Sequence, residues 1–182
     1  RQRQAHSSSG RFPELGTAGN LPSGEAYIVP YEGEVDGASL TAGTLPVEID
    51  GEVVLFTIQA NRAVTVQGDG PQAQAERAHL AAEPAYGNMA ELGFGVLADF
   101  GLEPIGEILL DEKLGLHIAF GRSDHFGGAV APKDFSSAAA VIHLDRIYIP
   151  GVMPRILVRT VSLGYGDGRN ETVMANGAYT IF

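Results

Sequence analysis

The chain has 182 residues, 45% of them hydrophobic and 19% charged, and a formal net charge of −10 at pH 7. This length allows one domain with a sizeable core, and the acidic charge is a poor match for the phosphate backbone of nucleic acids. No apolar run approaches the roughly 20 residues that span a membrane, and the absence of cysteine excludes disulfides and thiolate metal ligands. We therefore expect a protein that binds neither nucleic acid nor a membrane. The absence of cysteine leaves the compartment open, and the cytoplasm is the default expectation.

The first predicted segment is a lead-in. Residues 1–10 are polar and rich in Gly and Ser, and we expect them to be mobile. Residues 11–182 are predicted to form a single metal-binding domain of catalytic type. Because the chain starts with Arg1 rather than Met, we also expect that a preceding N-terminal domain is missing.

In the first half of the domain, apolar patterning predicts strands over 25–31 and 45–50, and two strands within 51–70 that join near Ala60-Asn61. A helix is predicted over 71–83, where Pro71 opens an Ala-rich segment. Residues 90–101 are ambiguous between helix and strand because they contain three glycines.

In the second half, residues 106–121 predict a short helix or strand, a turn, and a strand through His117. A long loop follows over 123–137, and long loops in compact domains are often functional. Strands are predicted over 140–149 and 155–162, and a closing hairpin over 165–182 with its turn at Asp167-Gly168. Strands outnumber helices and rarely alternate with them, which predicts an α+β fold: strand-rich, with a mostly antiparallel or mixed sheet and few helices.

Five polar residues interrupt these apolar segments: Glu25, Glu91, His117, His143 and Asp145. His143 and Asp145 are two apart in VIHLDRIYIP, so they point to the same face of a strand. Each residue alone has an ordinary explanation, because a carboxylate at a strand start is usually solvated and a histidine in an apolar strand is often hydrogen-bonded in the core. Together they form the ligand set expected for zinc, manganese, cobalt or ferrous iron in a chain without cysteine. A cation between His143 and Asp145 would offset the cost of burying that carboxylate.

Other polar residues carry a weaker signal. Asp124 and His125 lie in the long loop, where solvation is the ordinary interpretation and a place beside the site is the alternative. Residues 111–113, Asp-Glu-Lys, have the composition of an ordinary charged turn. His79 is expected on the solvent face of the predicted helix.

Several motifs occur in a familiar order: GNLPSGEAYIVP, ELGFG, LLDEKLGLHIAFG, FGG and IHLD. This order resembles the catalytic half of the aminopeptidase T family, metallo-aminopeptidases with two metal ions, and the resemblance covers nearly the whole chain. It implies metal ligands at the same five residues, with Glu91 bridging both ions. The family's enzymes have an α/β domain before this part, which agrees with a missing N-terminal domain.

The chain departs from the family at one position. The family carries a tyrosine seven residues after the histidine that matches His117, and here that residue is Asp124. A tyrosine hydroxyl can donate a hydrogen bond to a tetrahedral intermediate, whereas an ionised carboxylate cannot. We therefore place Asp124 and His125 beside Glu25 and Glu91 among the candidate catalytic residues, with His125 as an alternative proton donor and either glutamate as the group that passes a proton to the leaving amine.

The resemblance implies a metal-dependent hydrolase of aminopeptidase type, which removes N-terminal residues from peptides with a metal-activated water. Its cofactors would be two divalent ions of zinc, cobalt or manganese. Its substrate would be a peptide or a small amide. A homodimer is one option for its assembly. One alternative is a mononuclear Fe(II) ring-cleaving dioxygenase related to dihydroxypyridine dioxygenases, with His117, His143 and Asp145 as its triad and no clear role for Glu91. Another is a non-catalytic fragment that lacks its partner domain.

Overall fold

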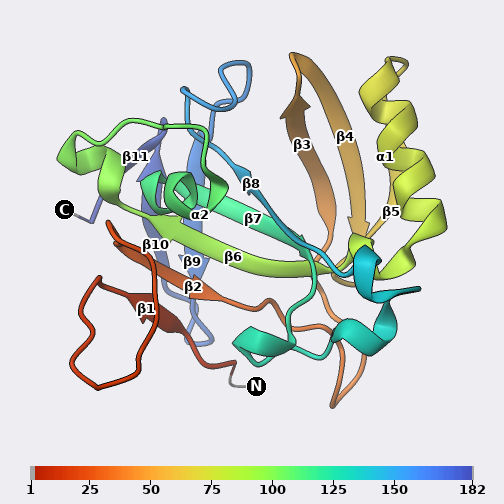
Figure 1. The fold of residues 1–182 in the computed structure, drawn as a ribbon. Helices are drawn as coiled ribbons and strands as arrows, with labels where there is room; N and C mark the ends of the chain where they lie inside the picture. Colours follow the sequence, from red (N-terminus) through yellow and green to blue (C-terminus); the bar gives the residue numbers. More distant parts are fainter. Residues whose placement is uncertain (1–2, 182) are drawn as a thin grey trace.

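The computed structural model describes residues 3–181, and this part of the chain contains three antiparallel sheets and two α-helices (Figure 1). The strand-rich fold predicted from the sequence is confirmed. The largest sheet has the order β1-β2-β6-β7-β8. Its strands are β1 (His6–Ser8), β2 (Glu25–Ile28), β6 (Met89–Gly95), β7 (Leu116–Gly121) and β8 (His143–Ile147). No helix within residues 3–181 is long and apolar enough to cross a membrane.

A second sheet and the long helix follow the predicted pattern. The strands are β3 (Gly43–Ile49), β4 (Glu52–Gln59) and β5 (Arg62–Gln67), in that order across the sheet. Ala60 and Asn61 join β4 to β5 with positive φ of 48° and 68°, the left-handed backbone that tight hairpins favour. The helix α1 (Pro71–Ala82) starts at its proline, as predicted, because proline lacks the N–H that would be unpaired there.

The third sheet corrects the prediction for the C-terminal segment. Its strands are β9 (Thr160–Gly164), β10 (Asn170–Ala175) and β11 (Ala178–Tyr179). The strand predicted over 155–162 begins only at Thr160, and the Asp167-Gly168 turn joins β9 to β10. The last hairpin turns instead at Asn176-Gly177, with φ of 50° and 83°, because asparagine and glycine tolerate that backbone best.

The remaining short elements settle the ambiguous segments. Residues 90–101 divide between β6 and a 3₁₀ helix (Leu97–Phe100), and the segment before β7 forms α2 (Ile108–Asp111) and a 3₁₀ helix (Glu112–Leu114). The lead-in expected over residues 1–10 contains β1, which pairs with β2, whereas residues 1–2 lie outside the described part of the chain. The predicted long loop contains two short 3₁₀ helices, Asp124–Phe126 and Pro132–Asp134.

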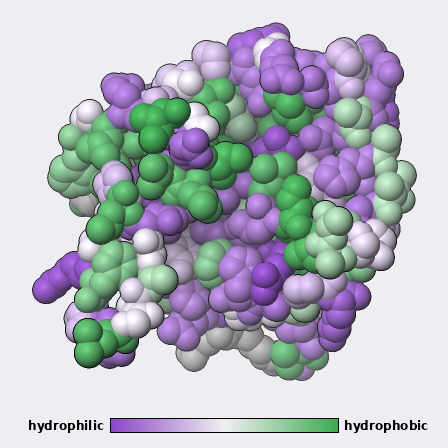
Figure 2. Space-filling view, in the orientation of Figure 1, coloured by the Kyte–Doolittle hydropathy of each residue, from purple (hydrophilic) through white to green (hydrophobic). Residues whose placement is uncertain are grey.

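The two faces of the five-stranded sheet differ in chemistry. On β7, Leu116 and Phe120 pack into the main core, where the Phe120 ring lies 5.1 Å from the Phe56 ring of β4. The alternate residues His117 and Ala119 point to the opposite face, because side chains alternate along a strand. In Figure 1 this opposite face lies beneath α2 and the segment that leads into β7. Phe100 and Leu109, which lie between β6 and β7, are exposed apolar side chains. Hydrophobic surface gathers on the left of Figure 2.

Candidate metal centre

The strand register places all five suspected residues on one face of the five-stranded sheet. Ala119 of β7 is paired with Glu91 of β6 on one side and with Asp145 of β8 on the other. Other pairs extend this row to Glu25, His117 and His143: Glu25 faces Gly95, Gly93 faces His117, and Gly121 faces His143. Residues far apart in the sequence thus meet because four neighbouring strands present the same face.

The five side chains form two groups that share Glu91. One group contains Glu25, Glu91 and His117, and the other contains Glu91, His143 and Asp145. Glu91 Oε1 lies 3.3 Å from His117 Nε2, and Glu91 Oε2 lies 3.2 Å from His143 Nε2. One carboxylate therefore reaches both groups, with a different oxygen for each.

Backbone carbonyls orient both imidazoles. His117 Nδ1 lies 3.0 Å from the carbonyl oxygen of Gly115, and His143 Nδ1 lies 2.7 Å from that of Arg122. Since a carbonyl only accepts, each Nδ1 donates its hydrogen. In the neutral ring this leaves the Nε2 lone pair of each histidine directed into the cluster, which is the arrangement found in histidine metal ligands.

The spacing of the donor atoms fits shared cations. His117 Nε2 lies 3.6 Å from Glu25 Oε2, and His143 Nε2 lies 3.8 Å from Asp145 Oδ1. Both oxygens are buried, and residues 3–181 supply no hydrogen-bond partner for either. These separations are too long for good hydrogen bonds, but two ligands of one tetrahedral zinc ion, bound at about 2.1 Å, lie roughly 3.4 Å apart. The residues present therefore fit a divalent ion in each group.

Lys113 and Glu112 belong to this centre, which corrects their interpretation as an ordinary charged turn. Lys113 is buried and donates through Nζ to Glu25 Oε1 and Glu112 Oε1. It holds one oxygen of Glu25 and leaves the other, Oε2, facing His117. Asp111, also buried, accepts hydrogen bonds from the backbone N–H groups of residues 105 and 106. The only sequence feature that could have indicated this role was the run of three consecutive charged residues just before an apolar strand.

The centre carries an excess of negative charge. Four buried carboxylates, those of Glu25, Glu91, Glu112 and Asp145, face one ammonium, that of Lys113. Burial, followed by the charge of Asp145, raises the pKa of Glu112 to about 7. Burial also raises the pKa of Glu25, although the hydrogen bond from Lys113 opposes this shift. Cations at the two groups would relieve the repulsion between these carboxylates.

The imidazoles show how the metal-free centre balances its charge. Burial alone would lower the pKa of His117, but the hydrogen bond with Glu91 and the charge of Asp145 raise it to about 9. The same kinds of contact raise the pKa of His143. Burial alone would raise the pKa of Glu91, but its hydrogen bonds with both histidines lower it to about 2. A proton on His117 Nε2 therefore occupies a position that a metal ion would take.

Asp124 and His125 lie outside both groups. Asp124 Oδ1 accepts a hydrogen bond of 2.5 Å from Arg122 Nε, so its carboxylate is held by a neighbouring side chain. The His125 ring lies 5.0 Å from the His143 ring, in an edge-on orientation. Burial, followed by the charges of His143 and Arg122, lowers the pKa of His125. His125 thus adjoins the centre, whereas Asp124 is part of its rim.

Two aromatic residues near His143 were not singled out from the sequence. Tyr27 lies two residues after Glu25 on β2 and therefore on the same face. The Phe126 ring lies 4.9 Å from the Tyr27 ring and 5.5 Å from the His143 ring. These rings form an aromatic wall beside the histidine that is the most exposed of the five residues. The alternation from Glu25 was the one sequence feature that could have indicated Tyr27.

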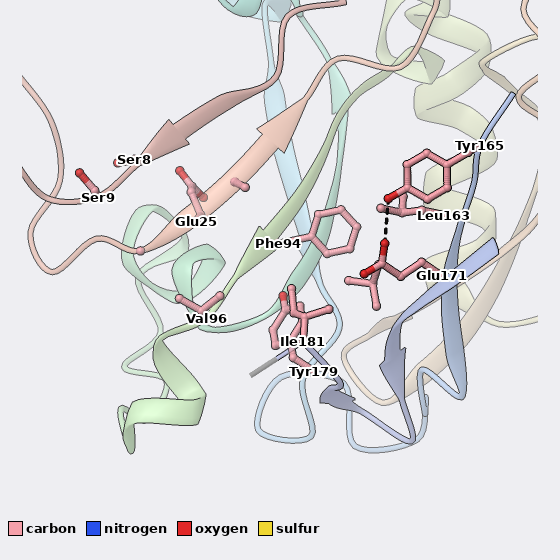
Figure 3. Close-up of a pocket in the computed structure, with 13 residues that line it drawn as sticks. Ser8, Ser9, Glu25, Phe94, Val96, Leu163, Tyr165, Glu171, Tyr179 and Ile181 are labelled. Atoms are coloured by element: carbon pink, nitrogen blue, oxygen red, sulfur yellow. Dashed lines mark hydrogen bonds between the residues drawn. The ribbon is translucent and has the colours of Figure 1, made fainter. Parts of the chain in front are cut away.

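An apolar cavity of about 520 Å³ lies beside β2 and β6 (Figure 3). Ala26 of β2 and Phe94 of β6 oppose each other there, one position along from Glu25 and Gly95. Leu163 and Tyr165 form part of the opposite wall. Glu25, at the start of β2, also lines this cavity, so the cavity adjoins the candidate metal centre at that end of the sheet.

The fold is similar to one solved structure in particular, wild-type AmpT from Thermus thermophilus. The two chains superpose with a TM-score of 0.53 at 20% sequence identity, and the match covers 86% of this chain. The chain spans 39% of the length of that protein. No protein-family model and no curated protein sequence matches the chain. The comparison therefore shows a shared fold, and the chemistry rests on the residues of the centre.

Proposed function

We propose that the protein is a metal-dependent hydrolase of aminopeptidase type that uses two divalent ions. The observation that carries this proposal is the sharing of Glu91, one oxygen towards each group of ligands. The fold similarity to AmpT, an aminopeptidase T, supports the same function. The chain spans 39% of the length of that protein. That the chain has the activity of the whole enzyme is therefore part of the proposal.

When bound, the two ions would supply an activated water and polarise the amide carbonyl of the substrate. The residues of the chain have distinct tasks around them. Glu91 would offer one oxygen to each ion. His117 and His143 hold their Nε2 atoms inward through the carbonyl contacts of Nδ1. Lys113 fixes the orientation of Glu25. Glu25 or Glu91 would pass the proton to the leaving amine.

The rim of the centre affects the expected activity. Asp124 is tied to Arg122 and, when ionised, cannot donate to a developing oxyanion. His125 adjoins His143 and offers an alternative donor. We therefore expect weak turnover of simple aminoacyl substrates. His125 would be the proton donor for the activity that remains.

The geometry favours this proposal over a mononuclear iron dioxygenase. A triad of His117, His143 and Asp145 would need all three donors around one ion, but the two histidines fall in different groups. In addition, Glu91 lies between the histidines and would have no task in a single-ion site.

The test is a titration of the metal-free chain with Zn²⁺, Mn²⁺ and Co²⁺, followed by native mass spectrometry and an assay on leucyl anilide. We expect two ions per chain. Asp145→Asn should remove one ion, Glu91→Gln should weaken both, and Asp99→Asn, at an exposed carboxylate, should change neither. One ion per chain with a preference for Fe²⁺ would contradict the hydrolase and favour the dioxygenase.

A further inference from the structure

The strand β8 carries two of the five candidate ligands and is the last strand of its sheet. Within residues 3–181 it pairs with β7 on one side and with no strand on the other. An unpaired strand edge presents a row of N–H and C=O groups that can bind another extended chain.

The register shows which groups these are. Arg122 N–H donates to Ile142 O at 2.8 Å, and Tyr148 N–H donates to Leu116 O at 2.8 Å. In an antiparallel ladder the hydrogen-bonded residues alternate, so the even-numbered residues of β8 bond to β7. The N–H and C=O groups of His143, Asp145 and Ile147 therefore point away from the sheet. The described part of the chain supplies no hydrogen-bond partner for them.

A hollow of about 460 Å³ lies along this edge. Four consecutive residues of β8, 144–147, contribute to its wall. Because consecutive side chains point to opposite faces of a sheet, four in a row can line one hollow only from the strand edge. Much of the remaining wall is apolar and includes Pro104, Ile108, Val152 and Met153.

We propose that an extended peptide binds along the outer edge of β8 as an added strand, with its N-terminal residue at the metal centre. This inference rests on the proposed function and specifies its substrate class as peptides with several residues after the scissile bond. Asp145 joins the two parts: its side chain belongs to the centre, and its backbone belongs to the free edge. A paired strand would run about 4.8 Å from β8, and its side chains would enter the apolar hollow.

Strand addition also accounts for selectivity. The main chain of the peptide supplies hydrogen bonds that are independent of sequence, while the hollow selects apolar side chains at alternate positions. The opposite edge of this sheet, β1, has three residues of which two are serine, and it is the strand of the sheet furthest from β8.

The first test uses backbone methylation of the substrate. The tetrapeptide Leu-Ala-Ala-Ala is compared with two analogues, N-methylated at the third or the fourth residue. Since alternate residues of a paired strand face the edge, methylation at one of these positions should lower kcat/KM by about 2–10-fold, which is the loss of one net hydrogen bond. Methylation at the other should have little effect. Equal effects at both positions would overturn the proposal.

The second test changes the edge itself. Ile147→Pro removes an N–H that faces outward, and proline is tolerated at such edge positions. Ile147→Val keeps the N–H and serves as the control for the loss of side-chain volume. The ratio of tetrapeptide to leucyl-anilide turnover should fall for the proline variant only. An unchanged ratio in a folded Ile147→Pro protein would contradict strand addition.

A binding measurement separates this proposal from the proposed function. In NMR hydrogen exchange, the tetrapeptide should slow exchange at the backbone amides of His143, Asp145 and Ile147 even if no hydrolysis occurs. Hydrolysis without this protection would overturn strand addition and leave the hydrolase intact. Protection that depends on protein concentration and needs no peptide would instead show that a second copy of the chain occupies the edge, which would also overturn the proposal.

Discussion

Gly93 lies directly opposite His117 in the β6–β7 ladder, and a β-carbon at this glycine would lie 1.9 Å from His117 Nε2. The imidazole of His117 therefore occupies the space that a side chain at position 93 would fill. This relationship explains why a glycine stands in the middle of a central strand, where it costs conformational entropy. The His117 side chain is fully buried.

The first prediction follows from this contact. Gly93→Ala should displace the His117 ring, lower the free energy of unfolding by about 1–3 kcal/mol through overpacking, and abolish binding of one of the two ions. The matched control is Gly164→Ala, since no heavy atom lies within 4 Å of a β-carbon there. Thermal denaturation and metal titration measure both effects. If Gly93→Ala changes neither the free energy of unfolding nor metal binding, the His117 ring does not need the space at position 93.

The second prediction compares two histidines. His143→Ala removes a proposed ligand, and its effect on metal affinity should exceed the 10–100-fold loss typical of residues behind the ligands. His79→Ala should leave affinity unchanged, because His79 lies on the exposed face of α1 and stacks on Tyr86 at 4.0 Å. Calorimetric titration provides the comparison. Equal affinities in the two variants would reject His143 as a ligand.

The third prediction concerns the buried ammonium. Lys113→Met leaves Glu25 and Glu112 without their partner, and breaking a buried ion pair in this way costs about 3–5 kcal/mol. The loss should be larger in the metal-free protein than in the loaded protein, because ions would offset part of the unpaired charge. Lys133→Met, at an exposed lysine, should change stability by less than about 0.5 kcal/mol. Chemical denaturation with and without Zn²⁺ tests this, and equal losses in both states would argue against a metal at Glu25.

The fourth prediction is a pH dependence of the metal effect. In the metal-free protein the pKa of His117 is raised to about 9, so its protonated form stabilises the fold fully below about pH 6.5, and this contribution is lost as the pH rises through about 9. A metal ion must displace that proton. Apparent affinity should therefore rise with pH, by about tenfold per unit for each proton displaced. Melting curves at several pH values should show a metal-induced increase in Tm that grows between pH 6.5 and 9, whereas a shift that shrinks would contradict the assignment.

The fifth prediction concerns the residue that departs from the family pattern. Asp124→Tyr replaces an ionised acceptor with a hydroxyl donor near the centre, and an oxyanion donor is typically worth about 100-fold or more in turnover. We expect the metal-loaded variant to cleave leucyl anilide faster than the unmodified chain. Asp124→Asn is the control, because it removes the charge without adding a phenol. Robust turnover of the unmodified chain, not improved by the tyrosine, would show that Asp124 is no handicap.

Local patterning predicted much of the fold. The β4–β5 hairpin and α1 follow from alternating apolar residues and from Pro71, which act over a few residues of chain. The C-terminal hairpin shows the limit of such patterning. Asp167-Gly168 and Asn176-Gly177 are equally good turn sequences. The first joins β9 to β10 and the second joins β10 to β11, because β10 pairs with both of these strands. Strand pairing depends on distant segments, so local sequence does not determine it.

The candidate site, like the fold, was predicted only in part from local sequence. The sequence by itself determined which residues were chemically out of place, because a charge or an imidazole in an apolar segment needs compensation wherever that segment lies. Only the tertiary structure decided that Glu91 faces both histidines and that Lys113 is buried against Glu25. The contact of Glu91 with both histidines depends on the register of β6, β7 and β8, and a shift of one residue in any of these strands would send its side chains to the opposite face of the sheet.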